Sequence, residues 1–442
     1  MTRLRVLWVV VALLTLRAVL VATSAHASSL ELYGFGPRAI AMGNASEAIS
    51  DDYYAVYENP ANLVLAKHIH FGFGTDLILN RFGIDRTGGQ PEWPSRLPQD
   101  NYLMHMGVST PLPGWLQDRA ALAVAFHLPI SGPTRLDSLD YRIPQLPVYD
   151  TLGDRLALVF GVSVRPLPWM TLGASGQVLT ALSGRSDIAL SPLDHRVDSK
   201  SLQVNLSTEV FPILGVTVLP RDDVRLALVW RGKSEVRYAL PLNVNVEQVG
   251  MMTFAVAGVG LWLPDTLAAA GSWQTGKWLW TGGLAWQRWS ELPPLAPTVT
   301  LSLDNAQLVQ PGGTKADILY AHNQPVPMGA QDIVVPRAGV EWRPHPQLAL
   351  RTGVQYRPTP LPKADGVANY LDSPATTATF GAGITLDDPL SLTRKPLQVD
   401  VGLGWTSLMR RTVLKADPFD PVGGTSVYGD SWHLAVALHH DF

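Results

Sequence analysis

The stretch from Glu31 to Leu63, ELYGFGPRAIAMGNASEAISDDYYAVYENPANL, decides how the rest of the chain is interpreted. Its landmarks are glycines, an acidic pair and a closing Asn-Pro-Ala: Gly34, Gly36, Gly43, Asp51, Asp52, Asn59, Pro60 and Ala61. The Ala-rich middle, residues 39–49, predicts one or two short helical turns. Asn59 interrupts any helix, because the residue before a proline is forced out of the α region. The stretch predicts a compact, turn-rich segment; the alternative is a plain loop with a common Asn-Pro turn.

The residues before this stretch have the pattern of a secretory signal. Arg3 and Arg5 precede an apolar run over residues 6–21, and Ala25-His26-Ala27 fits the small-x-small cleavage rule. We therefore expect a signal peptide over residues 1–27 and a mature chain that begins at Ser28. The alternative is an uncleaved anchor helix, because the run approaches the ~20 residues that span a bilayer.

Composition favours an exported protein with a large surface in lipid. Charged residues make up 16% of the 442 residues, against about 25% in soluble domains. The formal net charge of −3 gives no polybasic surface, so we expect no nucleic-acid partner. The absence of cysteine excludes disulfides and thiolate metal sites.

The C-terminal end alternates strictly between two kinds of side chain, which predicts a strand. One face carries Trp432, Leu434, Val436, Leu438, His440 and Phe442, and the other carries His433, Ala435, Ala437, His439 and Asp441. The same alternation recurs over residues 224–231, 347–357 and 397–406. In a soluble sandwich the apolar face would be the core, whereas in a membrane barrel it meets lipid and the polar, small face lines the lumen. Each strand alone permits both interpretations.

Connection lengths favour the barrel. Short turns alternate with long loops, as in outer-membrane barrels, which also have an even number of strands. We predict fourteen strands, at residues 68–82, 100–110, 118–129, 152–165, 169–182, 199–217, 223–245, 258–274, 277–290, 331–344, 347–358, 375–387, 396–410 and 429–442.

With the signal peptide, the glycine-rich N-terminal series and the final aromatic strand, the chain resembles the FadL-type transporters of the bacterial outer membrane. The resemblance implies an all-β fold: a transmembrane antiparallel β-barrel of about 14 strands over residues 68–442, with a small N-terminal hatch, or plug, over residues 28–67 inside the lumen. It implies hatch or gate roles for Gly43, Asp51, Asp52, Asn59, Pro60 and Ala61.

Further short motifs are similar to the same family. They are Leu263-Pro264-Asp265, Trp286-Gln287-Arg288-Trp289-Ser290 and the series Arg337-Ala-Gly-Val-Glu-Trp-Arg-Pro. Leu371-Asp372-Ser373-Pro374 departs from the Leu-Pro-Asp of the family, which puts its loop contact in doubt. Relatives also have a kinked third strand that opens the barrel wall, and Pro129 and Gly132 are the expected place for it; a plain strand end is the alternative.

Three charged residues are expected on the inner face. If residues 344–346 form a turn, Arg337 and Glu341 on one strand share that face with Arg351 on the next. They form either an ion-paired brace that fills the lumen or a cationic patch for an anionic head group. We favour the brace.

Tryptophans at predicted strand ends and turns are expected to anchor at the membrane interface. They are Trp115, Trp169, Trp230, Trp262, Trp278, Trp289, Trp342 and Trp405.

Catalysis and metal binding find little support in the sequence. There is no G-x-S-x-G nucleophile elbow, and we expect no enzyme and no cofactor. His68 and His70 share a strand face and His439 adjoins His440, but a structural metal site generally needs about four ligands. We expect interface histidines and assign no metal.

Together these features predict transport of hydrophobic small molecules, fatty acids or hydrocarbons, by passive diffusion past a plug, with outer-membrane lipid around a monomer. Desolvation of an apolar ligand would drive the process. Apolar loops such as residues 292–299 would catch the ligand. The alternative is a structural or assembly barrel that transports nothing. A continuous apolar tunnel favours the first, and a lumen filled with paired charges favours the second.

Overall fold

The computed structural model describes residues 29–90, 92–130, 140–149, 156–191, 196–246, 250–309, 315–322, 326–386, 396–415, 417 and 419–442. The predicted signal peptide, residues 1–27, lies outside the described residues. Among the helices in the described part of the chain, none is long and apolar enough to cross a membrane.

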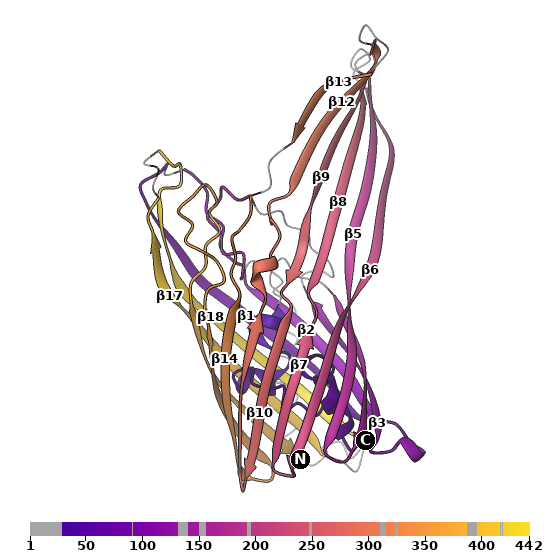
Figure 1. The fold of residues 1–442 in the computed structure, drawn as a ribbon, viewed down its shortest axis with the longest axis vertical. Helices are drawn as coiled ribbons and strands as arrows, with labels where there is room; N and C mark the ends of the chain where they lie inside the picture. Colours follow the sequence, from indigo (N-terminus) through magenta and orange to yellow (C-terminus); the bar gives the residue numbers. More distant parts are fainter. Residues whose placement is uncertain are drawn as a thin grey trace, which may run out of the picture.

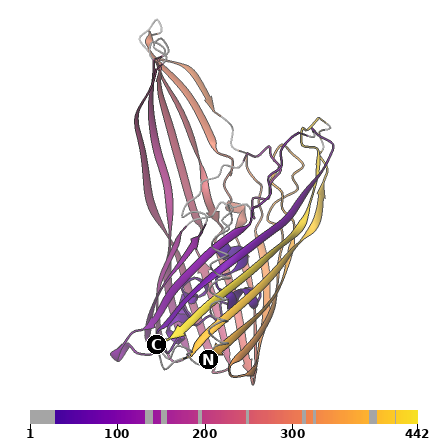
Figure 2. The same cartoon turned by 180° about the vertical axis from the view of Figure 1, so that it is seen from behind.

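Fourteen antiparallel strands form a closed wall, which confirms the predicted count (Figures 1 and 2). The first and last strands pair along their full length, from His70↔Asp441 to Thr87↔Gly424, and this pairing closes the barrel. The wall strands are β1 (His70–Thr87), β2 (Asn101–Pro111), β3 (Ala120–Pro129), β4 (Ala157–Leu167), β5 (Met170–Ser191), β6 (Arg196–Arg221), β7 (Val224–Arg231), β10 (Thr266–Thr275), β11 (Trp278–Gln287), β14 (Ile333–His345), β15 (Leu348–Arg357), β16 (Ala375–Leu386), β17 (Leu397–Val413) and β18 (Gly424–Asp441).

The orientation of the alternating faces decides between a soluble sandwich and a membrane barrel. On β3 the large side chains of Leu122 and Phe126 are exposed, whereas Ala121, Ala123 and Ala125 are buried. On β18, Trp432 and Leu434 are exposed, while His433, Ala435, Ala437 and His439 are buried. The apolar face therefore points out and the small or polar face points in, which is the arrangement of a barrel in lipid.

Four more strands continue beyond the wall at the end of the barrel with the long connections, here called the long-loop rim. They are β8 (Ser234–Val246), β9 (Gly250–Leu263), β12 (Thr298–Val309) and β13 (Lys315–His322). With the far ends of β5 and β6 they form an extension that rises above the barrel (Figure 1). The prediction of uninterrupted strands over residues 223–245 and 258–274 is wrong, because Gly232-Lys233 and Pro264-Asp265 interrupt them. The predicted loop over residues 291–330 contains β12 and β13.

The wall changes partners where the extension begins. Pairing of β6 with β7 ends at Ile213↔Arg231, and the Gly232 N–H donates to the Pro212 carbonyl at 2.9 Å. Pro212 has no N–H to continue the ladder. Beyond this level β5 pairs with β8 in parallel, starting at Ser183↔Ala239.

The N-terminal segment lies inside the wall (Figures 1 and 2). It contains α2 (Ser29–Tyr33), α3 (Pro37–Ala41), α4 (Ala55–Glu58) and the 3-10 helix η1 (Pro60–Leu65). Its aromatic residues pack with the inward alanines of β3 in one core: Phe35, Tyr53, Tyr54, Tyr57, Ala121, Ala123 and Ala125. The division of the chain at residues 27 and 67 stays a prediction.

Glycines on the inner face allow the segment to approach the wall. A Cβ on Gly353 would lie 2.3 Å from the Gly43 nitrogen, and one on Gly173 would lie 2.2 Å from the Pro60 carbonyl carbon. Gly43 itself has a positive φ of 65°. A larger residue at either wall position would push the segment away, so these glycines let backbone pack directly on backbone.

Pro129 is the last residue of β3 and pairs with Leu103 in unbroken register. In the described part of the wall, β3 therefore ends at Pro129, as in the alternative of a plain strand end. Gly132 lies outside the described residues. A wall opening at Pro129 and Gly132 stays a prediction.

The β1–β18 pairing leads to a test of closure. Because a closed wall leaves no unpaired strand edge, we expect the full chain to migrate faster on SDS gels unheated than after boiling. A chain without residues 424–442 lacks the closing strand and should show no such shift. Identical migration of heated and unheated full-length protein would contradict a closed barrel.

Candidate functional site

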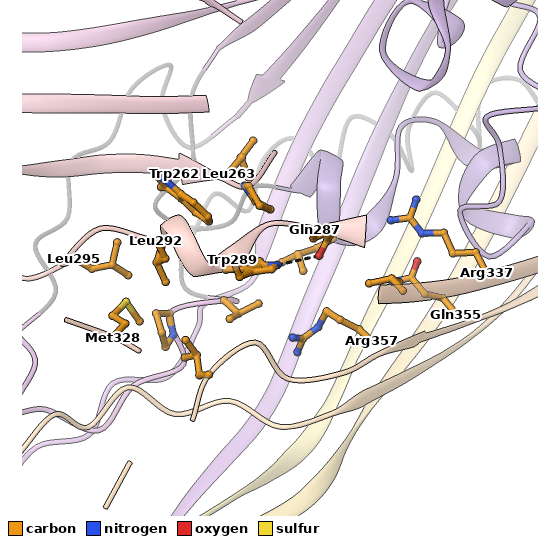
Figure 3. Close-up of a pocket in the computed structure, with 16 residues that line it drawn as sticks. Trp262, Leu263, Gln287, Trp289, Leu292, Leu295, Met328, Arg337, Gln355 and Arg357 are labelled. Atoms are coloured by element: carbon orange, nitrogen blue, oxygen red, sulfur yellow. Dashed lines mark hydrogen bonds between the residues drawn. The ribbon is translucent and has the colours of Figure 1, made fainter. Parts of the chain in front are cut away.

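An apolar pocket lies at the long-loop rim, between the N-terminal segment and the loops (Figure 3). One end of its lining is apolar, and the other carries the polar side chains of Gln287, Arg337, Gln355 and Arg357. Its remaining lining residues are Leu32, Pro147, Val148, Trp262, Leu263, Pro264, Trp289, Leu292, Leu295, Met328, Val335 and Leu361.

Two breaks in the strands build the apolar end. Trp262 and Leu263 stand at the end of β9, just before the break at Pro264. Trp289 begins the short helix η3 (Trp289–Glu291), which follows β11. The two indoles tilt against each other with ring centroids 5.4 Å apart, and the Trp289 Nε1–H donates to Gln287 Oε1 at 3.0 Å (Figure 3). Trp262 still pairs with Glu235 within β9, next to a register shift between Val236 and Arg237, whereas Trp289 lies in η3. Both rings are buried.

The predicted interface location is therefore wrong for two tryptophans, since Trp262 is 3% exposed and Trp289 is 9% exposed. The motifs at these positions are similar to those of the family, but neither motif showed which way the rings point. Other predicted tryptophans are exposed on the outer face. Trp278 and Trp342, for example, stack across β11 and β14 with centroids 5.5 Å apart.

Loops from three parts of the chain cover the pocket. Gln145 forms parallel bridges with Arg96 on one side and Tyr370 on the other. The Gln145 N–H donates to Asn369 O at 3.1 Å, and the Leu371 N–H donates to Gln145 O at 2.8 Å. We call Arg96, residues 140–149 and residues 358–374 the loop lid. Beneath it, an apolar cluster joins the lid to neighbouring loops: Leu295, Met328, Leu361 and Tyr370.

The pocket is nearly full in this state. Its free volume is about 40 Å³, and one water needs about 10–15 Å³ of such volume. The pocket thus has room for a few waters and none for a hydrocarbon chain. A ligand must displace lid or lining side chains as it enters.

Arg357 links the pocket to the loop lid. Its guanidinium donates to both carboxylate oxygens of Asp372 at 2.9 Å and to the Tyr149 hydroxyl at 2.9 Å. Arg357, Asp372 and Tyr149 are all buried. Although Leu371-Asp372-Ser373-Pro374 departs from the family pattern, its aspartate makes a bidentate contact that ties the lid to β15. The sequence contained no signal for this partner.

Arg337 is paired with the N-terminal segment. Its Nη1 lies 3.2 Å from Glu47 Oε1, and Arg231 Nη2 lies 3.6 Å from the same oxygen. Of the three predicted lumen charges, only Arg337 lines the pocket. The geometry therefore separates it from Glu341 and Arg351.

Glu341 and Arg351 belong to an ion network nearer the short turns. They face each other in the β14–β15 register, and Arg351 Nε lies 2.7 Å from Glu341 Oε2. Arg38 of the N-terminal segment reaches the same carboxylate oxygen at 3.2 Å. Arg351 also pairs with Asp400 on β17, and Arg38 pairs with Asp51 at 3.2 Å. With Arg343, which pairs with Glu341 at 2.8 Å, arginines and carboxylates alternate in this network, as the brace interpretation expects.

The predicted hatch residues make specific contacts. Asn59 is fully buried, and its Oδ1 accepts from the Ala61 N–H at 3.1 Å. Its Nδ2 donates to Glu47 O at 2.7 Å and to Thr217 Oγ1 on β6 at 2.8 Å. Asn59 thus joins two parts of the segment to the wall. The other predicted hatch residues lie on turns or helix starts: Gly43 N–H donates to Thr379 Oγ1, Asp52 Oδ1 accepts from Tyr54 N–H, and Pro60 opens η1.

His70 and His439 of the predicted histidine cluster contact other protein groups. His70 Nδ1 lies 2.8 Å from Asp441 Oδ1, its Nε2 lies 3.2 Å from His439 Nδ1, and His68 is exposed. Across the residues that the structure describes, no group of three or more potential ligands has an arrangement that could hold a metal ion.

A closed fourteen-strand barrel with an apolar outer face and a lidded apolar pocket defines an outer-membrane barrel of the hydrophobic-compound transport class. Residues 203–431, more than half of the chain, match the family described as outer membrane protein transport protein (OMPP1/FadL/TodX). The chain belongs to this family, which its sequence motifs also resemble.

Individual relatives are more distant. Alkane uptake protein A of Marinobacter nauticus is 24% identical over 440 residues, covering 91% of each chain. The structure of a Pseudomonas aeruginosa FadL homologue has a TM-score of 0.58 at 13% identity and covers 95% of this chain and 99% of its own. The toluene transporter TodX of P. putida has a TM-score of 0.58 at 15% identity and covers 93% and 99%. These structures support the fold.

The contacts of Asn59 predict how the N-terminal segment is held. Replacing Asn59 by Leu removes three hydrogen bonds in a buried site, where each unmet group costs about 1–3 kcal/mol. Thr217→Val removes the wall partner with little change of shape. We expect both variants to assemble as barrels and to label faster than the parent at a cysteine placed at Ala48. The exposed Thr412→Val should label at the parent rate, and equal rates in all variants would make Asn59 a simple connector.

Glu58 gives the segment a dependence on pH. Burial raises the pKa of Glu58 to about 7, against 4.5 for the free side chain, although Arg231 opposes this shift. Between these values the packed segment holds the proton more tightly than the released one, so packing weakens as pH rises from about 4.5 to 7. Hydrogen exchange at residues 46–59, corrected for intrinsic rates, should show this loss. Glu58→Gln should flatten it, and an identical pH profile in that variant would contradict the assignment.

Proposed function

We propose that this protein admits hydrophobic small molecules through the lidded pocket and lets them diffuse passively past the N-terminal segment. The observation that carries the proposal is the pocket itself. In a family of outer-membrane transport proteins, this chain places two tryptophans and several aliphatic side chains where the loops meet the lumen. Burying apolar ligand surface there gains about 25 cal/mol per Å², so no chemical step is needed.

The N-terminal segment acts as the hatch in this proposal, with residues 28–67 as the plug and 68–442 as the barrel. Support comes from its burial and from its polar ties to the wall. Asn59 bonds Thr217, and Arg38 pairs with Glu341. Gly43, Asp51, Asp52, Pro60 and Ala61 shape the turns that a gate would move. A ligand leaving the pocket must shift these contacts.

A lateral exit into lipid is part of the proposal. The sequence placed it at Pro129 and Gly132. A second position is favoured by an apolar depression on the outer surface, lined by Phe160, Gly176, Val210 and Pro212. The N-terminal segment packs directly against the inner side of the wall here, because a Cβ on the inward Gly161 would lie 2.9 Å from Val56. Outer-membrane lipid would receive the ligand directly.

The relatives point to different hydrophobic ligands, alkanes in one name and toluene in another. Hydrocarbons, aliphatic and aromatic, therefore enter the proposal as ligands, whereas fatty acids differ from them by a terminal carboxylate. We further propose export through the signal peptide at residues 1–27 and action as a monomer. The paired charges near the short turns would suit a structural barrel, but the pocket and the family favour transport.

Uptake by cells tests this function. Deletion of the gene should reduce uptake of labelled hexadecane or toluene, and complementation should restore it. Leu295→Asn places an amide in the pocket and should lower uptake several-fold, whereas Leu414→Asn changes an exposed leucine and should not. Equal uptake by deleted and complemented cells, with the barrel present in the membrane, would reject transport of these compounds.

A further inference from the structure

We infer that Asp372 and Glu47 make the pocket selective for uncharged ligands and exclude molecules that end in a carboxylate. The inference rests on the proposed transport function and concerns which hydrophobic molecules it serves. It follows from the hydrogen bonds and ion pairs that the four polar side chains at the inner end of the pocket make with other protein groups.

Of the two arginines that line the pocket, Arg357 is the one bonded to the loop lid. Its two Nη groups bond both oxygens of Asp372 at 2.9 Å, and Nη2 also reaches the Tyr149 hydroxyl. Nη2 donates as well to Ser373 O at 3.2 Å. The Asp372 side chain is 0% exposed. This arrangement satisfies the guanidinium in the bidentate geometry that an incoming carboxylate would require.

Arg337 is compensated from the other side of the pocket. Its Nη1 lies 3.2 Å from Glu47 Oε1, and the Glu47 side chain is 2% exposed. The N-terminal segment thus supplies a counter-charge that Arg337 shares with Arg231, and the loop lid supplies the counter-charge for Arg357.

The two neutral polar side chains of the lining are also engaged. Gln287 Oε1 accepts from the Trp289 indole at 3.0 Å, and Gln355 Oε1 accepts from Asn44 Nδ2 at 3.2 Å. Gln287, Gln355, Arg337 and Arg357 therefore each bond another protein group, and in the described part of the chain the buried Trp262 Nε1–H is a lining donor that makes no hydrogen bond. A ligand meets the apolar surfaces of these groups and the rings of Trp262 and Trp289.

A carboxylate is at a disadvantage in such a site. It would lose its water and would have to displace a buried carboxylate or add a second negative charge to an already paired arginine. A buried charge without a matched partner is strongly unfavourable. A neutral chain of the same length meets no such penalty, because apolar contacts suffice.

Palmitate and its methyl ester test the inference, since they share one hydrocarbon chain and differ in charge. Uptake of both, and of hexadecane, would be measured in a host without its own long-chain transporter. The parent should take up hexadecane and methyl palmitate in strong preference to palmitate. Asp372→Asn keeps a hydrogen bond to Arg357 but removes the counter-charge, and should raise the palmitate-to-ester ratio about tenfold, as expected for one charge-assisted hydrogen bond.

Three further variants separate this effect from a loosened lid. Asp372→Asn combined with Arg357→Gln should return the ratio to that of the parent, because the exposed cation is gone. Glu47→Gln removes the counter-charge that Arg337 and Arg231 share and should raise the ratio without touching the lid. Asp85→Asn breaks an exposed pair with Arg410 and should leave the ratio unchanged.

The outcomes distinguish this inference from the function beneath it. A parent that takes up palmitate as well as its ester, or a ratio that neither Asp372→Asn nor Glu47→Gln raises, overturns the selectivity and leaves transport standing. A parent that takes up neither ester nor hexadecane, with the heat-shifted barrel present, overturns the transport function itself.

Discussion

Lipid offers no hydrogen-bond partner to backbone N–H and C=O groups, so every strand edge in the membrane must be paired. The pairing of β1 with β18 meets this requirement. Because the pairing runs from His70↔Asp441 to Thr87↔Gly424, the wall has no open edge in the membrane. The strands can then expose leucines and tryptophans outward, since the solvent there is apolar. The polar, small face must turn inward, and this creates the problem of what fills the lumen.

Paired charges and the N-terminal segment fill the lumen. Near the short turns, Arg38, Glu341, Arg351 and Asp400 neutralise one another. At mid-height, the N-terminal segment packs its backbone on wall glycines and its aromatic rings on the alanines of β3. At the long-loop rim of the described residues an apolar pocket remains, beneath loops that meet around Gln145. Its two arginines pair with Asp372 and Glu47.

Much of the architecture could be predicted because it follows from local periodicity. Period-2 alternation and the order of short and long connections were enough for fourteen strands and for the inward face of Ala435 and Ala437. The extension could not be predicted, since the alternation resumes beyond Gly232-Lys233 and Pro264-Asp265 with the other parity facing inward, and only the pairing of the strands shows where each piece goes. The direction of Trp262 and Trp289 was also hidden, because a ring at a strand end points according to the break beside it.

The sequence by itself determined the barrel, its parity, its membrane-facing surface and the compact character of residues 31–63, since each depends on neighbours within a few positions along the chain. Only the tertiary structure decided which polar and charged side chains contact each other. Arg357 finds Asp372, Arg337 finds Glu47, and Asn59 finds Thr217. Glu47 lies 290 positions from Arg337, and Thr217 lies 158 positions from Asn59. Asp372 comes from a loop whose path depends on the rest of the lid. Closure of the barrel sets these distances, and no local pattern records them.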